Sequence, residues 1–522
     1  IRDHCVTGVQ TCALPICLIL FSALEGGHWL TALAMAAASL IAAVYTIRIV
    51  QGVCLEKPRE PQAHGAGSPA PTALAVCAGA YLLACLFPEP LVHLAQSIAG
   101  KSGAALPELE GTWPPSVAIP FAGAFALYLA GRLAPRWRDA SAGIVAAASV
   151  AAFFAQGDLS PVQQLFGGLF ALAGALVVVY SIGYMEHEKG SDHYYFFLLV
   201  MTSSLVGLAT APTFGGFFAF WEIMTFSSFM LVAHKRTREA LGAAKLYFVM
   251  CAGGAYAMQV GLFALQAAAP HAGMAQLGQA LQAYGPAAGA GIALLALAGF
   301  AVKAGLFPLH SWLPAAHPVA PSSISAPLSG LLTKAGVLGL AVLAPLLATG
   351  AVNGGGQTLA SLLAFAAAVT FVLGEVMALR QQDVKRMLAY STLAQIGEIT
   401  LILSVGTFAA TAGALTHAVN HAVMKDLLFL AAGAFIMRAG TQQIEGLAGI
   451  GKAMPFTGAC MAVGLVSIMG LPLTGGFFSK FMMLTAAVQA GHAWTAALIL
   501  AGSLVGRSEE RRVGKECRSR WA

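Results

Sequence analysis

The chain alternates long apolar stretches with short polar ones along almost its whole length. Each apolar stretch has about 20 residues, which is enough to cross the hydrocarbon core of a bilayer as a helix. The stretches cover residues 28–50, 71–95, 116–133, 142–156, 162–184, 193–212, 214–233, 243–267, 287–307, 324–347, 357–379, 390–410, 412–437, 455–478 and 482–506. The pattern predicts an all-α polytopic membrane protein with about 14–15 transmembrane helices.

The composition agrees with this prediction and adds an orientation. Apolar residues make up 58% of the chain and charged residues only 10%, whereas a soluble domain has roughly 25% charged residues. Basic clusters follow the odd-numbered stretches, so all of them fall on one side of the membrane, which we expect to be cytoplasmic. The clusters are Arg48, Lys57 and Arg59; Arg132, Arg136 and Arg138; His234, Lys235, Arg236 and Arg238; and Arg380, Lys385 and Arg386.

Both ends of the chain change composition abruptly. Residues 507–522 contain six basic and three acidic groups and follow directly on an apolar stretch. They resemble translated sequencing-adapter DNA, as residues 1–16 do; a natural basic tail lying on anionic lipid is the alternative for the C-terminal segment. We leave both segments out of the fold prediction.

An internal repeat suggests two related units. Residues 18–42 align without a gap on residues 482–506 with nine identities. We expect residues 17–105 to be the two-helix C-terminal tail of a preceding transport unit, and residues 106–506 to be a second unit that is cut at its C-terminus. A natural fusion and a chimeric joining of two neighbouring genes both explain the repeat.

Two lysines lie beside helix-breaking residues inside apolar stretches. Lys303 precedes Gly305 and Pro308, and Lys480 follows Pro472 and Gly475. A lysine in hydrocarbon costs roughly 3 kcal/mol or more, and a broken helix at membrane depth is tolerated where it lines a wet cavity. Broken helices in corresponding halves of a chain point to an ion-transport site.

Six blocks of sequence carry a family resemblance. They are Tyr180-Ser-Ile-Gly-Tyr-Met185, Phe220-Trp-Glu-Ile-Met224, Val302-Lys-Ala-Gly-Leu-Phe-Pro-Leu-His-Ser-Trp-Leu-Pro-Ala-Ala-His317, Gln382-Asp-Val-Lys-Arg-Met-Leu-Ala-Tyr-Ser-Thr392, His417-Ala-Val-Asn-His-Ala-Val-Met-Lys-Asp-Leu-Leu-Phe429 and Gly470-Leu-Pro-Leu-Thr-Gly-Gly-Phe-Phe-Ser-Lys480. In this order they resemble the antiporter-like proton-translocating subunits of respiratory complex I, of membrane-bound hydrogenases of the hydrogenase-4 and formate hydrogenlyase type, and of multi-subunit sodium/proton antiporters. The resemblance implies two inverted five-helix repeats, each with one broken helix that carries an ionisable residue.

The resemblance pairs Glu222 with Lys303. A buried carboxylate alone tends to take up a proton and a buried lysine alone tends to lose one, whereas together they stabilise each other's charge. We therefore expect Glu222 and Lys303 to form a switch, with a static structural ion pair as the alternative. Lys334 matches the family's lysine on the next helix and is the expected relay, and Lys480 is the expected terminal site.

A helical face of titratable groups continues this line. His417, His421 and Lys425 stand at i, i+4 and i+8, on one side of a helix. Because imidazole can both accept and donate a proton near neutral pH, this face is predicted to conduct protons. The alternatives are satisfied core histidines, or a zinc site for which the sequence offers no third ligand. Lys245 either stabilises the Glu222 region or extends to the membrane interface.

Three carboxylates depart from the family pattern. Glu375, Glu398 and Asp426 lie in apolar surroundings, where the family has mostly apolar or small residues. They are either additional relay groups or the mark of a distinct branch.

We therefore predict a proton-translocating membrane subunit of a redox-driven complex, of the NADH-quinone oxidoreductase or energy-converting hydrogenase type, in a prokaryotic inner membrane. The alternatives are a subunit of a sodium/proton antiporter without a redox partner, and a scaffold that does not pump. No nucleotide-binding motif or cluster-forming cysteine spacing occurs in the sequence, so no cofactor or redox centre is expected in this chain. Quinone, flavin, iron–sulfur or nickel–iron centres are expected in partner subunits. Those partners would be other membrane subunits, including paralogous antiporter-like ones, and nucleic acid is not among them.

Overall fold

The computed structural model describes residues 113–133, 135–186, 188, 190–352 and 354–502. The chain divides into two compact units, Ile1–Trp113 and Pro114–Ala522, and nearly all described residues belong to the second. The predicted stretches 28–50 and 71–95, the 18–42 half of the repeat and both end segments lie outside the described residues. The following paragraphs concern the second unit alone.

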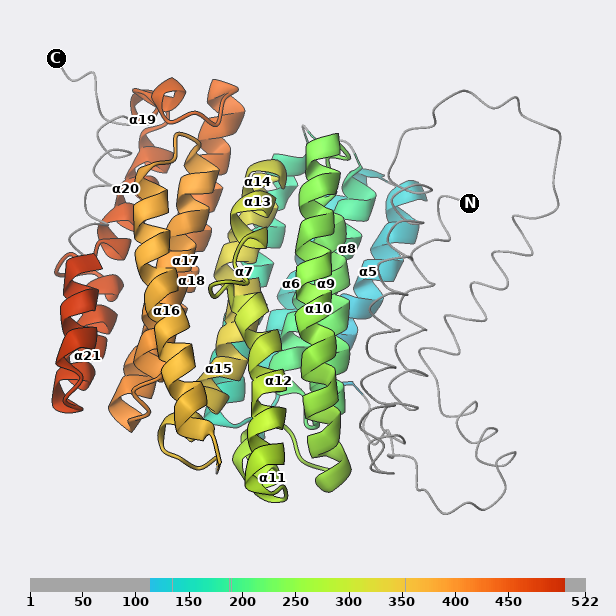
Figure 1. The fold of residues 1–522 in the computed structure, drawn as a ribbon. Coiled ribbons are helices and arrows are strands. Elements are labelled where there is room, and N and C mark those ends of the chain that lie inside the picture. Colours follow the sequence, from blue (N-terminus) through green and yellow to red (C-terminus); the bar gives the residue numbers. More distant parts are fainter. Residues whose placement is uncertain (1–112, 134, 187, 189, 353, 503–522) are drawn as a thin grey trace, which may run out of the picture. The chain divides into compact units, whose positions relative to one another are not determined.

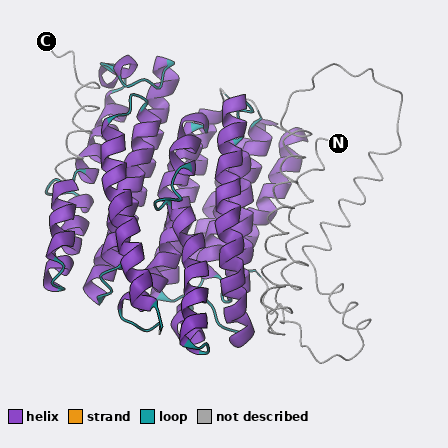
Figure 2. Cartoon of the chain, viewed as in Figure 1, coloured by secondary structure: helices purple, strands orange, loops and turns teal. Residues whose placement is uncertain are grey.

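Helices form almost all of the described part, and no strand occurs in it (Figure 2). The first helices are α5 (Pro115–Leu133), α6 (Pro135–Ala155), α7 (Pro161–Met185), α8 (Ser191–Thr210), α9 (Phe214–Val232), α10 (Arg238–Ala268), η2 (Met274–Gln276), α11 (Leu277–Gln282), α12 (Pro286–Ala304), α13 (Trp312–Val319) and α14 (Ser322–Pro327). They are followed by η3 (Leu328–Leu332), α15 (Thr333–Ala348), α16 (Gly356–Leu379), α17 (Val384–Leu403), α18 (Phe408–Ala439), η4 (Glu445–Leu447), α19 (Ile450–Ala453), α20 (Pro455–Ile468) and α21 (Gly475–Gln489).

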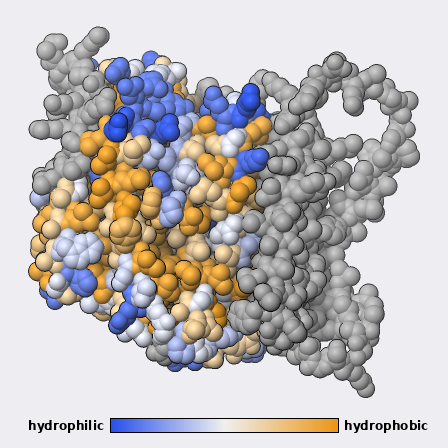
Figure 3. Space-filling model, in the orientation of Figure 1, coloured by the Kyte–Doolittle hydropathy of each residue, from blue (hydrophilic) through white to orange (hydrophobic). Residues whose placement is uncertain are grey.

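The predicted all-α membrane fold is confirmed, while the two inverted repeats stay a prediction. Within the described residues, eight helical segments are long and apolar enough to cross a membrane, or nine if the pair bent by 117° between Ala453 and Pro455 counts as one. On the face seen in Figure 3, apolar residues cover the middle of the molecule and hydrophilic residues gather at its ends. This distribution suits a bundle whose middle lies in hydrocarbon and whose ends lie in water.

The apolar stretch 455–478 contains the helix break that Pro472 and Gly475 predict. It is not one helix, because α20 ends at Ile468 and α21 begins at Gly475. Gly470 and Leu473 between them have positive φ angles of 69° and 74°, which a continuing helix does not allow. Hydropathy counts the apolar side chains on both sides of this break and does not register the break itself.

Helices that follow one another in the chain pack side by side, from α5 on one side of the unit to α21 on the other (Figure 1). The α15 helix links the two sides, since it packs against α12 and also against α17 and α18. The α18 helix is the centre of the second side, with α17, α20 and α21 as its neighbours. The bundle therefore has a continuous interior from α9 and α12, through α15 and α18, to α21.

The basic clusters described by the structure lie at one end of the bundle, as predicted. Arg138 at the start of α6 pairs with Asp192 at the start of α8 over 2.9 Å. Lys235, after α9, lies 3.9 Å from Glu188, which precedes α8. These contacts join the connection between α7 and α8 to two of the clusters.

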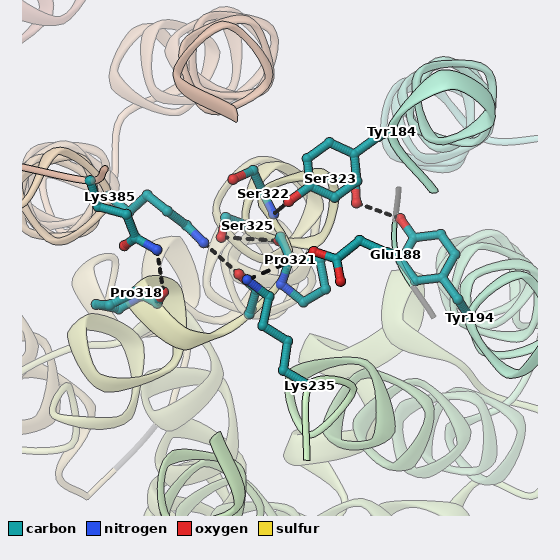
Figure 4. Close-up of polar contacts among 12 residues, drawn as sticks. Tyr184, Glu188, Tyr194, Lys235, Pro318, Pro321, Ser322, Ser323, Ser325 and Lys385 are labelled. Atoms are coloured by element: carbon teal, nitrogen blue, oxygen red, sulfur yellow. Dashed lines mark hydrogen bonds and ion pairs between the residues drawn. The ribbon is translucent and has the colours of Figure 1, made fainter. Parts of the chain in front are cut away.

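The third cluster joins the same end through the junction between α13 and α14. The Ser322 amide donates to the Tyr184 hydroxyl near the end of α7 over 3.1 Å, and the Lys385 ammonium donates to the Ala320 carbonyl. Asp383 caps α17 by accepting from the Arg386 amide, which places Lys385 in the first turn. Figure 4 shows Lys385, Lys235 and Glu188 converging on this junction.

The close approach of α12 and α15 depends on Gly336. A Cβ atom at this position would lie 2.5 Å from the Ala304 amide nitrogen and 2.7 Å from the Phe300 carbonyl oxygen. Both neighbours are backbone atoms, so a side chain could fit only if the two helices moved apart. Gly253 on α10 is the contrasting case, with no atom within 4 Å of an added Cβ.

We predict that Gly336→Ala destabilises the chain by about 1–3 kcal/mol, because overpacking forces backbone shifts. The matched variant Gly253→Ala should be neutral or stabilising, since alanine has the higher helix propensity. Thermal unfolding of the purified chain in detergent measures both variants. Equal stability of the two would contradict this account of the packing between α12 and α15.

Candidate functional site

Lys303 lies in the last turn of α12, where the sequence ends the helix. Gly305 adopts a left-handed conformation with φ 83°, and its amide donates to the Ala301 carbonyl, as in a helix C-cap. The Trp312 indole, at the start of α13, donates to the Val302 carbonyl over 2.8 Å. The Val302 carbonyl therefore keeps a hydrogen-bond partner at the end of the helix. The break also places the Lys303 cation at a helix C-terminus, where the helix dipole favours positive charge.

The Lys303 ammonium is fully buried among hydroxyl and aromatic groups. It donates to the Thr225 hydroxyl on α9 over 2.8 Å and to the Tyr247 hydroxyl on α10 over 3.1 Å. It also lies 5.7 Å from the ring centroid of Trp221 and 5.1 Å from that of Tyr247. Neutral oxygens and π-faces can hold either an ammonium or an amine, so the site is suited to both forms of the lysine.

Glu222 and Lys303 do not form a direct ion pair in this structure, and their role as a switch stays a prediction. No ion pair between these two described residues occurs within 4.0 Å, and the buried Glu222 Oε1 atom has no hydrogen-bond partner in the described part of the chain. Thr225, one turn further along α9, is the residue that receives the Lys303 ammonium. The carboxylate is thus on α9 one helical turn from the residue that the lysine contacts.

Lys334 follows a turn of π-helix, η3, and uses a carbonyl from that turn. Its ammonium donates to the Ser329 carbonyl over 3.0 Å. Its Nζ also lies 2.6 Å from the His421 Nδ1 atom on α18. Either the ammonium donates to a neutral imidazole, or the protonated Nδ1 donates to an amine. One proton between these two nitrogens can therefore belong to either residue.

The π-helical turn is also where Asp426 packs. A Cβ atom at Gly330 would clash with the Asp426 Oδ1 atom, so the carboxylate could keep this position only beside a glycine. That oxygen is buried and has no hydrogen-bond partner among the described residues. A buried carboxyl group thus lies against η3, close to the turn that begins with Lys334.

His417 connects three helices. Its Nδ1 atom lies 2.9 Å from the Ser479 hydroxyl on α21, and its Nε2 atom lies 2.9 Å from Gln395 Oε1 on α17. Ser479 can donate either to Nδ1 or to the Gly475 carbonyl 3.0 Å away. In the first case the imidazole is neutral; in the second it donates from both nitrogens and is a cation. A rotation of one hydroxyl is enough for the site to accept either charge state.

The two histidines of α18 are stacked, with ring centroids 6.3 Å apart and an interplanar angle of 25°. Lys425, the third member of the predicted face, makes its hydrogen bonds elsewhere. Its ammonium donates to the Leu388 carbonyl over 3.1 Å and to the Ser391 hydroxyl over 2.9 Å, both on α17. The structure therefore links His421 to Lys334 and His417 to α21, while Lys425 turns toward the first half of α17.

Lys480 pairs with one of the unexpected carboxylates. Its Nζ atom lies 3.3 Å from Glu398 Oε2 on α17, and the side chains are 11% and 0% exposed, respectively. The Gly470 Cα lies against the Lys480 stem, because a Cβ there would be 3.1 Å from Lys480 Cδ. The broken segment between α20 and α21 is therefore packed against the lysine that the sequence placed beside it.

Several residues of the site were not singled out from the sequence. Thr225, Tyr247 and Ser479 are common in helices, so nothing in their spacing marks them as lysine or histidine partners. Gln395 could have been found, since it is a polar residue in an apolar stretch and lies one turn from Glu398. His317 on α13 was missed as well; it stacks on Phe429 at 4.6 Å, and neither ring nitrogen has a hydrogen-bond partner in the described part.

The described residues contain no group of three or more histidine, cysteine, aspartate or glutamate side chains that could hold a metal ion. Lys245, whose role the sequence left open, lies partly buried on α10, two residues before Tyr247. The chemistry that the buried groups can perform is the acceptance and donation of protons.

The chain is similar in sequence to several known proteins. Residues 211–506 match the family model described as NADH:quinone oxidoreductase/Mrp antiporter, TM. The chain is 33% identical over 382 residues to hydrogenase-4 component B of Escherichia coli K12, covering 70% of this chain and 56% of that protein. It is 32% identical over 350 residues to NADH-quinone oxidoreductase subunit N of Desulforudis audaxviator, covering 65% of this chain and 68% of that one.

A solved structure is similar as well. A chain of the membrane-bound sulfane sulfur reductase, an archaeal respiratory membrane complex, superposes with a TM-score of 0.69 at 29% identity and covers 77% of this chain and 87% of that chain. The fold and the order of the helices are thus shared with subunits of multi-subunit membrane complexes.

We predict that Thr225→Val destabilises the chain by about 1–3 kcal/mol, because the buried Lys303 ammonium loses an acceptor. Thr349→Val is the matched control. Both hydroxyls donate to the carbonyl four residues earlier, but Thr349 is exposed, so its loss should cost no more than about 0.5 kcal/mol. Thermal unfolding measures the difference, and equal effects would mean that Thr225 does not support the lysine.

Proposed function

Because this chain belongs to the family of NADH:quinone oxidoreductase and Mrp antiporter membrane subunits, we propose that it translocates protons as a subunit of a redox-driven membrane complex. The observation that carries the proposal is the 2.6 Å contact between Lys334 and His421. Two basic nitrogens in the interior of a membrane bundle compete for one proton at this point. Such a contact serves proton transfer better than it serves stability, since each group left ionised in hydrocarbon is costly.

The proposed path runs between the two helix breaks. Redox energy from partner subunits changes the separation between Glu222 and Lys303, and this alters the affinity of Lys303 for its proton. The proton then reaches Lys334, the next lysine along the packed helices α12 and α15. From Lys334 it passes to His421 through their direct contact.

The second half of the path uses the stacked histidines. The hydrogen bonds of stacked imidazoles lie in their ring planes, so transfer from His421 to His417 uses a bridging group or a ring rotation. His417 then exchanges its proton through Ser479 with the region of Lys480, the terminal site. Lys425, which is hydrogen-bonded to α17, is a side branch toward the end of the bundle that carries the basic clusters.

The energies required are modest. Moving one charge across 100 mV takes about 2.3 kcal/mol. A tenfold change in the proton affinity of a site corresponds to about 1.4 kcal/mol, so a change of roughly two orders of magnitude at one lysine offsets the field. The approach or withdrawal of a single buried carboxylate can supply a change of this size.

The similarity to subunits of membrane complexes also suggests which partners this chain has and in which membrane it lies. The chain spans 56% of hydrogenase-4 component B, and it resembles subunits of complexes, so we propose that it acts beside other membrane subunits, including paralogous antiporter-like ones. The redox centres would lie in those partners. The membrane would be the prokaryotic inner membrane.

A second candidate is a subunit of a sodium/proton antiporter without a redox partner. The matching family model includes the Mrp antiporters, and the buried lysines would serve either coupling. Proton movement driven by a sodium gradient in the absence of electron donor would favour this candidate.

We predict that Lys303→Ala lowers the rate of proton translocation in proteoliposomes of the assembled complex at least about tenfold, which corresponds to about 1.4 kcal/mol. The redox activity of the partner subunits should be retained or slowed. Lys452→Ala, which removes an exposed lysine at α19, serves as the control and should translocate normally. An unchanged yield of translocated protons in Lys303→Ala would contradict the proposal.

A further inference from the structure

The second half of the unit repeats the order of charged groups found in the first. In the first half, α9 carries Glu222, α10 follows, and Lys303 lies at the break between α12 and α13. In the second half, α17 carries Glu398, α18 follows, and Lys480 lies just after the break between α20 and α21. A carboxylate thus precedes a broken helix with a lysine in both halves.

Glu398 is buried in a way that makes Lys480 its essential partner. The carboxylate is 0% exposed, and Lys480 lies 3.3 Å away. Neither Glu398 oxygen has a hydrogen-bond partner among the described residues, so no amide or hydroxyl there stabilises its charge. A buried carboxylate without such partners remains ionised only beside a cation. The pair therefore depends on the contact between α17 and α21.

Both members of the pair adjoin the contacts of His417. Gln395, one turn before Glu398 on α17, holds His417 Nε2, and Ser479, which precedes Lys480 on α21, holds Nδ1. If α21 moved away from α17 and α18, the Ser479 contact of His417 and the ion pair would both be lost, while the Gln395 contact between α17 and α18 would remain. The pairing of Lys480 and one of the two hydrogen bonds of His417 thus depend on the position of the same helix.

We infer that Glu398 controls the loading and release of the proton on Lys480, as the second-half counterpart of Glu222. This inference rests on the proposed function. A proton that leaves His417 converts the Lys480 amine to an ammonium, which the Glu398 carboxylate holds. When α21 separates from α17, the ammonium loses its counter-charge and gives up that proton on the release side. Lys480 returns to the amine, water that enters between the separated helices keeps Glu398 ionised, and the next proton from His417 restores the pair.

The ion pair is testable on the full chain in lipid, without any transport. Lys480→Met removes the only cation within 4.0 Å of Glu398 in the described part, so Glu398 should take up a proton. Infrared spectra should then gain a carboxylic-acid carbonyl band that is absent from the wild type and from the double variant Glu398→Gln/Lys480→Met. If Lys480→Met gains no such band, Glu398 is not held ionised by Lys480, and the inference is overturned.

The role in transport is tested in proteoliposomes of the assembled complex. Glu398→Gln should lower proton translocation at least about tenfold, because Lys480 no longer holds its proton, and Glu398→Asp should fall between this variant and the wild type. The double variant, which lacks both charges, should unfold no earlier than the wild type yet remain inactive, which separates transport from stability. Glu445→Gln, at an exposed position before α19, controls for the loss of one negative charge.

The outcomes distinguish this inference from the proposed function. If the wild type and Glu398→Gln translocate equally, Glu398 has no part in release, while the proposed function stands. If the wild type itself moves no protons, the proposed function fails, and the infrared result still decides whether Glu398 and Lys480 form a charged pair.

Discussion

The structure depends on how ammonium groups are accommodated inside an apolar helical bundle. Carbonyls inside a regular helix are already hydrogen-bonded, and three of the buried lysines lie at or contact places where a helix is irregular. Lys303 ends α12 before Gly305, Lys334 donates to a carbonyl of the π-helical turn, and Lys385 donates to the carbonyl that follows α13. Breaks and bulges in helices are therefore the means by which charge is held here, and they frequently mark functional sites in other proteins.

The surroundings of these groups also allow their protonation state to change. Hydroxyl, carbonyl and imidazole groups around Lys303, Lys334 and His417 can accept or donate with small rotations, so a protonated and a neutral form both have partners. Fixed ion pairs would favour one form. The exception is the contact between Lys480 and Glu398, which holds one charge state as long as α17 and α21 remain together.

The sequence predicted the all-helical membrane fold and drew attention to buried titratable residues, and the reason is physical. A lysine or histidine in an apolar stretch is costly, so Lys303, Lys334, His417, His421 and Lys480 stand out without any structure. Their partners do not stand out. Thr225 and Ser479 cost little in a helix, and only the packing of α9 and α21 makes them acceptors. Hydropathy likewise could not place the break after Ile468, which depends on the backbone conformation of Gly470 and Leu473.

The distance between Glu222 and Lys303 shows the other limit of sequence reasoning. The family resemblance pairs the two residues, but on α9 the lysine contacts the side chain of Thr225 and not that of Glu222.

Lys334 and His421 are two titratable groups that the structure brings into direct contact. Nitrogen NMR of the chain in lipid bilayers, with lysine and histidine labelled with ¹⁵N, measures the protonation of both directly across a pH range. A shared proton predicts that both resonances change together in one coupled titration, which Lys334→Met removes from His421. Independent titration of the two groups, unaffected by that variant, would contradict the account.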